Sequence, residues 1–270
     1  MMNLLRSELF RLRKRSQSWM LILIGIILTA LFYGAFLIAY FALSGEEKLD
    51  VQDGLLLTNV QENGMSISLL FASILLSILA AGLIGSEYSW NTIRPLLARA
   101  TSRSSLLTAK WLTLLIYTVV LTVILVGVTP TLFSSVASMI SGESPGGSVE
   151  IFRGIVFATG RILLTMLPTA ALAFMLALVT RSIAAGIAVS IGIGFLEPAI
   201  FGLLAALSDV FDTIQKFGLA WGSQQLMMKG YDDGVTNSEV WQAGITMLVY
   251  TVIFVVISYV VFRRRDVTSG

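Results

Sequence analysis

Long uninterrupted blocks of apolar residues are the main feature of this chain of 270 residues. Each block is about 20 residues long, the length that an α-helix needs to cross a hydrocarbon core about 30 Å thick. The blocks do not alternate apolar with polar residues, as the strands of a membrane barrel do. The pattern therefore predicts an all-α integral membrane protein with six transmembrane helices. They cover residues 19–41, 66–84, 111–133, 155–179, 184–207 and 243–262.

The segment 1–15, before the first block, has a shorter apolar pattern. Met2, Leu5, Leu9 and Leu12 recur at helical spacing and form one stripe. Most of the basic residues lie off this stripe, which is typical of an amphipathic helix on the inner leaflet, with its cations near anionic lipid headgroups. The alternative is a disordered basic tail that only sets the topology. The basic residues are Arg6, Arg11, Arg13, Lys14 and Arg15.

Composition agrees with a membrane protein and gives no sign of a catalytic domain. Apolar residues make up 56% of the chain and charged residues 13%, with a mean hydropathy of +0.86. The chain has no cysteine and no histidine, which removes Ser–His dyads, HExxH zinc sites and thiolate chemistry. We therefore expect a single membrane domain over 1–270 that is not an enzyme and holds no metal or cofactor.

The basic residues predict the orientation. With the N-terminus inside, 13 of the 18 basic residues fall on one side and four on the other, and Arg161 lies within a span. The positive-inside rule then places both termini in the cytoplasm of a cell-membrane protein. Because the membrane accounts for these cations, the basic pI suggests no nucleic-acid partner. The inner residues are Arg6, Arg11, Arg13, Lys14, Arg15, Arg94, Arg99, Arg103, Lys110, Arg181, Arg263, Arg264 and Arg265.

The segment 85–110, between the second and third blocks, is longer than a connecting turn requires. Trp90, Ile93 and Leu97 fall on one helical face, with Glu87, Asn91 and Arg94 elsewhere. Ser102 is a candidate N-cap for the helix that continues into the third span. We expect a helix across the cytoplasmic surface that can pass force from a soluble partner to the two spans beside it.

In this segment the chain resembles the ABC-2 family of ATP-binding-cassette transporter permeases. The family pattern is roughly E-Y-x-x-G-T-[IL]-R, then P-x-S-R and a lysine, and the chain closes with a similar F-x-x-R-D at 262–266. Three positions depart from the pattern: Asn91 replaces Gly, Ala100 replaces Pro, and Pro95 is expected to kink or shorten the surface helix. The matching residues are Glu87, Tyr88, Thr92, Arg94, Ser102, Arg103 and Lys110.

The resemblance implies a division of labour between chains. The membrane subunit forms the path of an exporter, pairs with a second permease subunit, and couples to a separate ATPase that holds ATP and magnesium. Consistent with this, the chain has no GxxxxGK[ST] loop. The alternative is that these charges are solvated and only follow the positive-inside rule. The residues that the resemblance assigns to ATPase coupling are Glu87, Tyr88, Asn91, Thr92, Arg94 and Arg103.

Two ionisable residues lie inside the predicted spans, Arg161 in the fourth and Glu197 in the fifth. A charge at the centre of a membrane helix costs at least about 2.5–3.5 kcal/mol, so it normally has a partner or a polar cavity. Their depths are similar, which predicts an Arg161–Glu197 pair in the outer half. A substrate path lined by both residues remains an alternative, as does an Arg161 side chain that reaches the headgroups.

The fifth span also carries a row of small residues, and Pro198 follows at the same interval. Small residues four apart allow another helix to approach closely, either within the chain or from a second subunit. The segment 208–240 is too apolar for a simple loop and predicts short helices on the outer side. The row comprises Gly186, Ser190, Gly194 and Gly202.

The favoured function is therefore an ATP-driven permease subunit that exports a hydrophobic or amphipathic compound, such as an antibiotic, an antimicrobial peptide or a lipid. The rival function is a self-sufficient ion-coupled carrier or a membrane sensor. Such a carrier generally shows broken helices and several polar groups at the midplane, whereas this chain offers one charge pair. The sequence does not identify the substrate.

Overall fold

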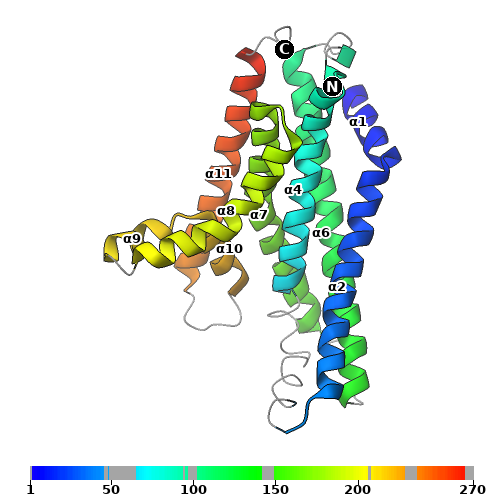
Figure 1. The fold of residues 1–270 in the computed structure, drawn as a ribbon, viewed down its shortest axis with the longest axis vertical. Coiled ribbons are helices and arrows are strands. Elements are labelled where there is room, and N and C mark those ends of the chain that lie inside the picture. Colours follow the sequence, from blue (N-terminus) through cyan, green and yellow to red (C-terminus); the bar gives the residue numbers. More distant parts are fainter. Residues whose placement is uncertain are drawn as a thin grey trace.

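A computed structural model of the protein describes residues 2–45, 48, 65–93, 95–96, 102–141, 149–205, 208–228 and 236–264. All the regular structure in these ranges is helical (Figure 1). The predicted all-α class is therefore confirmed. The helices are α1 (Met2–Lys14), α2 (Ser16–Ala42), α4 (Met65–Ser89), α6 (Arg103–Ser141), α7 (Val149–Thr180), α8 (Ile183–Ala205), α9 (Asp209–Gln215), α10 (Leu219–Met228) and α11 (Asn237–Arg264).

The centre of the bundle is the contact of α4 with α7. Alanines on both helices are almost completely buried, among them Ala80 and Ala81 on α4 and Ala173 and Ala177 on α7. Small side chains let two membrane helices approach closely, so that packing takes the place of the hydrophobic effect. Helix α6 completes this core through buried leucines spaced seven residues apart, Leu107, Leu114 and Leu121.

The remaining long helices lie around this core and expose apolar side chains. Within the described ranges, six helices are long and apolar enough to cross a membrane: α2, α4, α6, α7, α8 and α11. The prediction of a multi-pass membrane protein is thus supported. The exposed apolar faces of α2, α8 and α11 are those that lipid or another subunit would cover. The start of α1 and the end of α11 lie at the same end of the molecule, which we call the terminal end (Figure 1).

Helix α6 is longer than predicted. We expected its span to end at residue 133, but it continues to Ser141 over 39 residues, or about 58 Å at 1.5 Å per residue. This exceeds a hydrocarbon core of about 30 Å, and Figure 1 shows α2 and α6 running side by side beyond the lower end of α4. The short helices expected within 208–240 are α9 and α10.

Candidate functional site

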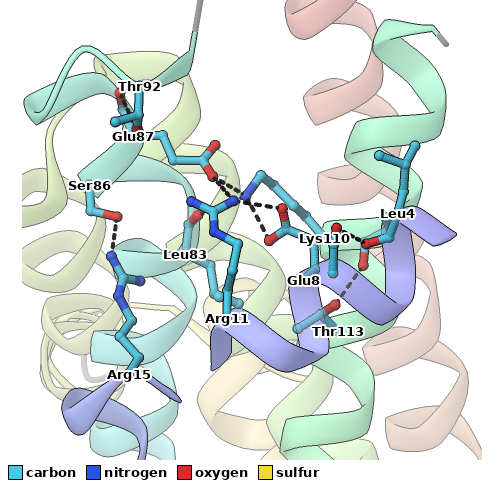
Figure 2. Close-up of polar contacts among 12 residues, drawn as sticks. Leu4, Glu8, Arg11, Arg15, Leu83, Ser86, Glu87, Thr92, Lys110 and Thr113 are labelled. Carbon is cyan, nitrogen blue, oxygen red and sulfur yellow. Dashed lines mark hydrogen bonds and ion pairs between the residues drawn. The ribbon is translucent and has the colours of Figure 1, made fainter. Parts of the chain in front are cut away.

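Four charged side chains from three helices meet at the terminal end of the bundle. Glu8 and Arg11 come from α1, Glu87 from the last turn of α4, and Lys110 from the second turn of α6. We call these four residues the ionic junction. Figure 2 shows the carboxylates of Glu87 and Glu8 on either side of the Lys110 ammonium, with Arg11 beside them. The junction joins segments that are far apart in the sequence.

Lys110 is the centre of the junction. Its Nζ lies 2.5 Å from Glu87 Oε1 and 3.2 Å from Glu8 Oε2, and it donates to the backbone oxygen of Leu83 at 3.3 Å. Lys110 is 1% exposed, Glu87 3% and Glu8 5%. Charges buried this deeply persist only where opposite charges and hydrogen bonds replace water. The junction therefore holds α1, α4 and α6 in one relative position.

Arg11 links the two carboxylates from the solvent side. Its Nη1 lies 2.9 Å from Glu8 Oε1 and 3.3 Å from Glu87 Oε1. Its side chain remains 46% exposed, so this contact is screened more than that of Lys110. The second oxygen of Glu87, Oε2, is buried and has no hydrogen-bond partner among the described residues.

Arg15 extends the network toward α2. It is the non-helical residue between α1 and α2, with an extended backbone. Its Nη2 donates to Ser86 Oγ at 2.6 Å and its Nη1 to the backbone oxygen of Gly82 at 3.4 Å, while the guanidinium lies 5.2 Å from the centre of the Trp90 ring. Burial lowers the pKa of Arg15 from its ordinary value and repulsion from Arg11 adds to this, whereas Glu87 and Glu8 oppose it. An arginine pKa starts so high that the side chain stays charged.

Helix α4 ends in a Schellman motif at the base of the predicted coupling segment. The N–H of Thr92 donates to the oxygen of Glu87, and the N–H of Asn91 to the oxygen of Tyr88. Asn91 has a φ of 54°, the left-handed conformation that this motif requires and that glycine and asparagine adopt most readily. This explains why Asn91 can replace the Gly of the ABC-2 pattern, because Asn and Gly both fit the turn.

The predicted helix across the cytoplasmic surface is broken at residues 90–92, before Pro95. The chain leaves α4 at Trp90 and Asn91, and Ile93 is already helical. Pro95 thus falls in the first turn, where a missing amide donor has no partner to lose. The predicted kink at Pro95 is wrong, because the break in the helix lies before Pro95. The predicted shortening of the helix by Pro95 falls on residues 97–101, outside the described residues, and stays a prediction. Trp90 is 66% exposed and Ile93 is 4% exposed, so the two do not share one face.

Ser102 is the N-cap of α6, as predicted. Its Oγ accepts from the N–H of Ser105 at 3.0 Å, and its own N–H donates to Ser105 Oγ at 3.2 Å. This is the reciprocal arrangement of a capping box, with a serine where Glu or Gln is usual. Arg103 follows as the first residue of α6 and is partly buried.

The predicted coupling residues occupy different environments. Asn91 is exposed and Thr92 is half-buried at the tip of the turn. The Arg181 guanidinium lies over the ring of Tyr88, 5.8 Å from the ring centre. Glu87, by contrast, is buried within the chain. In this conformation its carboxylate contacts Lys110 and Arg11, and its role in coupling to an ATPase stays a prediction. Arg94 lies outside the described residues.

One of the two charges inside the spans, Glu197, has a backbone partner. Glu197 on α8 accepts a hydrogen bond at Oε1 from the N–H of Ala220, 2.8 Å away in the first turn of α10. A carboxylate at a helix N-terminus interacts favourably with the unpaired amides and the helix dipole. The backbone is therefore a partner that sequence reasoning did not foresee. The pairing of Glu197 with Arg161 stays a prediction.

The row of small residues on α8 divides into two halves. A Cβ on Gly186 would lie 2.7 Å from the oxygen of Ala173 and 2.9 Å from the Cβ of Ala81. Ser190 is also buried, at 4% exposure. Gly194 and Gly202 have nothing within 4 Å of such a Cβ. The predicted close approach thus occurs within the chain at the first half, and the second half is open.

An apolar cavity of about 240 Å³ lies between α4, α7, α8 and α10. Hydroxyl groups from all four of these helices line it, including Ser77, Thr169, Ser190 and Ser223, together with Pro168. Apolar walls with a few hydroxyls suit a hydrophobic or amphipathic guest. Among the residues that the structure describes, no group of three or more acidic side chains is placed to hold a metal ion.

Sequence reasoning missed Glu8. It is the only acidic residue in the first 45, and it lies four residues before Leu12 on the buried face of α1. A single acid among five cations, at helical spacing from a buried leucine, is the signal that could have indicated an internal ion pair. The predicted stripe differs from the buried face, because Met2 is 83% exposed while Glu8 and Leu12 are buried.

The comparisons with known proteins give a family and one relative. The relative, the "Uncharacterized protein YhcI" of Bacillus subtilis (strain 168), is 27% identical over 210 residues, which cover 71% of this chain. The matched part spans 63% of the relative's length, less than two thirds. A family model matches residues 20–268, which is most of the chain. The chain therefore belongs to the family described as "Protein of unknown function (DUF2705)".

Proposed function

We propose that this chain is the membrane-spanning permease subunit of an ATP-driven transporter, whose motor is a separate ATPase. The observation that carries the proposal is the ionic junction at the base of the segment between α4 and α6. Glu87 and Lys110 join the two ends of this segment, and Glu8 adds α1 to the same contact. A force applied to the segment would therefore move three helices as a unit.

The path of such a force leads into the middle of the bundle. Helix α4 packs against α2, α6, α7 and α8, so a displacement of its terminal end is felt by most of the spans. The small cavity beside α4 would change its shape in the same motion. The apolar walls and hydroxyls of this cavity favour export of a hydrophobic or amphipathic compound.

The docking surface for the ATPase is the exposed turn after α4. Trp90 is 66% exposed and Asn91 is exposed beside it. Exposed tryptophans are among the residues that contribute most to binding at protein interfaces. The resemblance of residues 87–110 to the ABC-2 coupling region supports this assignment. The open half of the small-residue row on α8, at Gly194 and Gly202, suits contact with a second permease subunit.

The test is to isolate the tagged full-length chain from its own membranes in mild detergent and to identify what accompanies it. We expect an ATP-binding protein to co-purify, with ATPase activity that depends on the permease. Trp90→Ala should weaken this association at least about tenfold, as for an interface hot spot. The matched control is Trp241→Ala, since Trp241 is 73% exposed near the start of α11. Transport driven by an ion gradient without an ATPase would overturn the proposal and favour the ion-coupled carrier.

A further inference from the structure

A groove of about 320 Å³ opens between α1 and the end of α4, next to the ionic junction. Three cationic side chains line it, those of Arg11, Lys14 and Arg15, together with Leu83 and Trp90 from the α4 side. We call it the α1 groove. Neither the resemblance nor the family assigns a ligand to this groove. Glu87 and Trp90, which line it, also belong to the proposed coupling segment.

The two arginines of the groove are held in place by the protein itself. Ser86 Oγ and the ring of Trp90 fix the guanidinium of Arg15, and the carboxylates of Glu8 and Glu87 fix Arg11 through a single nitrogen, Nη1. A guanidinium carries five N–H donors, so both side chains retain donors beyond these contacts. Lys14 lies 5.9 Å from the ring centre of Phe10 at the edge of the groove. The donors are therefore oriented before any ligand arrives.

The charge in and around the groove is positive. Glu8 and Glu87 also line it, but Lys110 lies against both carboxylates from the interior. Four cations thus surround two carboxylates, and two positive charges are left without a partner inside this set. Arg15 is partly buried, which strengthens its attraction for an anion, whereas Arg11 and Lys14 are exposed and can be reached from solvent. The groove has the chemistry of an anion site, and planar guanidinium groups match the oxygens of a phosphate.

The position of the groove indicates where the anion comes from. Arg15 directly precedes Ser16, the first residue of a membrane-spanning helix. Phe10 is 61% exposed and Trp19 is 59% exposed close by, and aromatic side chains of this kind concentrate at the membrane–water boundary. A phosphate bound at this depth belongs to a lipid whose acyl chains lie along the exposed face of α2.

We propose that the α1 groove binds the phosphate of one phospholipid with an anionic headgroup. The proposal does not rest on the transport function, and it goes beyond a general attraction of a basic helix to the membrane. Arg6 and Arg13 carry the same charge on the same helix but do not line the groove. If the groove is a specific site, replacing Lys14 weakens lipid binding more than replacing Arg13 does. If the attraction is diffuse, the two replacements have the same effect.

The experiment measures lipid binding to the full-length chain in detergent by native mass spectrometry. The probes are dioctanoyl-phosphatidylglycerol, dioctanoyl-phosphatidylcholine and inorganic phosphate. We expect one phosphatidylglycerol to be retained in preference to phosphatidylcholine, and inorganic phosphate not to displace it. Equal retention of the two lipids would overturn the proposal. Displacement by inorganic phosphate at equal concentration would also overturn it and indicate a site for a free anion.

Matched variants locate the site. Lys14→Gln should weaken phosphatidylglycerol binding about fivefold, since a cation at the membrane surface contributes about 1 kcal/mol to lipid attraction. Arg13→Gln removes the same charge one residue away. Among the described residues the contact of Arg13 is made by its backbone oxygen, which accepts from Trp19 Nε1, so binding should change less than twofold. Equal losses in both variants would mean diffuse attraction. Loss of a co-purifying ATPase in Lys14→Gln, with lipid binding unchanged, would identify the groove as a protein-docking surface and overturn the lipid assignment.

Discussion

Two glutamates near helix ends are stabilised in opposite ways. Glu87 lies in the last turn of α4, where the carbonyl end of the helix dipole repels an anion, whereas Glu197 faces the first turn of α10, where unpaired amides attract one. Glu87 is accordingly surrounded by Lys110 and Arg11. Glu197 takes a backbone N–H, that of Ala220. The free-energy cost of a buried carboxylate therefore depends on which end of a helix lies next to it.

The contacts of the two glutamates also connect different sets of helices. The ionic junction connects α1, α4 and α6 through charged side chains, so its strength depends on every member. The contact at Glu197 connects α8 to α10 through neutral backbone N–H donors, those of Ala220 and Trp221.

Removing the central cation should have the largest effect. Lys110→Met leaves Glu8 and Glu87 buried without their main partner and should lower the free energy of unfolding by about 3–5 kcal/mol. Chemical unfolding in detergent, followed by circular dichroism, measures this loss. Adding Glu8→Gln and Glu87→Gln removes the stranded charges, so the triple variant should recover part of the stability. A triple variant no more stable than Lys110→Met would show that the carboxylates are not the source of the loss.

The two halves of the row on α8 should respond differently to the same change. Gly186→Ala places a methyl group 2.7 Å from the oxygen of Ala173 and should destabilise the chain by about 1–3 kcal/mol through overpacking. Gly194→Ala meets nothing within 4 Å and should be neutral or slightly stabilising, because alanine favours a helix. Thermal unfolding in detergent compares the two. Equal effects would contradict the division of the row.

Glu197 offers a test that separates the backbone contact from the predicted ion pair. Glu197→Gln keeps an oxygen that accepts from the Ala220 amide, so it should lower stability by less than about 1 kcal/mol, whereas Glu197→Ala should lose about 1–2 kcal/mol. If an Arg161–Glu197 pair dominates instead, the Gln and Ala variants should lose about the same. Unfolding measurements on both variants, with Arg161→Gln beside them, decide between the two partners.

The turn after α4 should show the smallest effect. Asn91→Gly supplies the left-handed conformation directly and should change stability by less than about 0.5 kcal/mol. Asn91→Ala should lose about 1 kcal/mol, since a side chain with a Cβ and no local hydrogen bond is unfavourable at that φ. Thermal unfolding of the two variants is the measurement. A larger loss in Asn91→Gly than in Asn91→Ala would mean that the side chain, and not the backbone, matters at this position.

The boundaries of the spans show how far local pattern can be trusted. The six apolar blocks predicted the six long helices, because a membrane helix must satisfy its backbone internally and present apolar residues to lipid. The ends were less accurate. The start of α6 at Arg103 follows its predicted cap, Ser102. The third span was predicted to end at residue 133, but α6 continues to Ser141, since helices continue into water wherever caps and neighbouring helices support them.

Sequence alone determined that this chain is an α-helical membrane protein, and the capping role of Ser102 also followed from local pattern. Both depend on residues close together in the chain. Only the tertiary structure decided that Glu8 meets Lys110 across 102 positions, that Glu87 faces inward, and that Ala220 supplies the partner of Glu197. The physical reason is that the role of a carboxylate depends on the groups around it in space. It can dock a partner, form a buried ion pair or cap a helix, according to which helix the fold brings beside it.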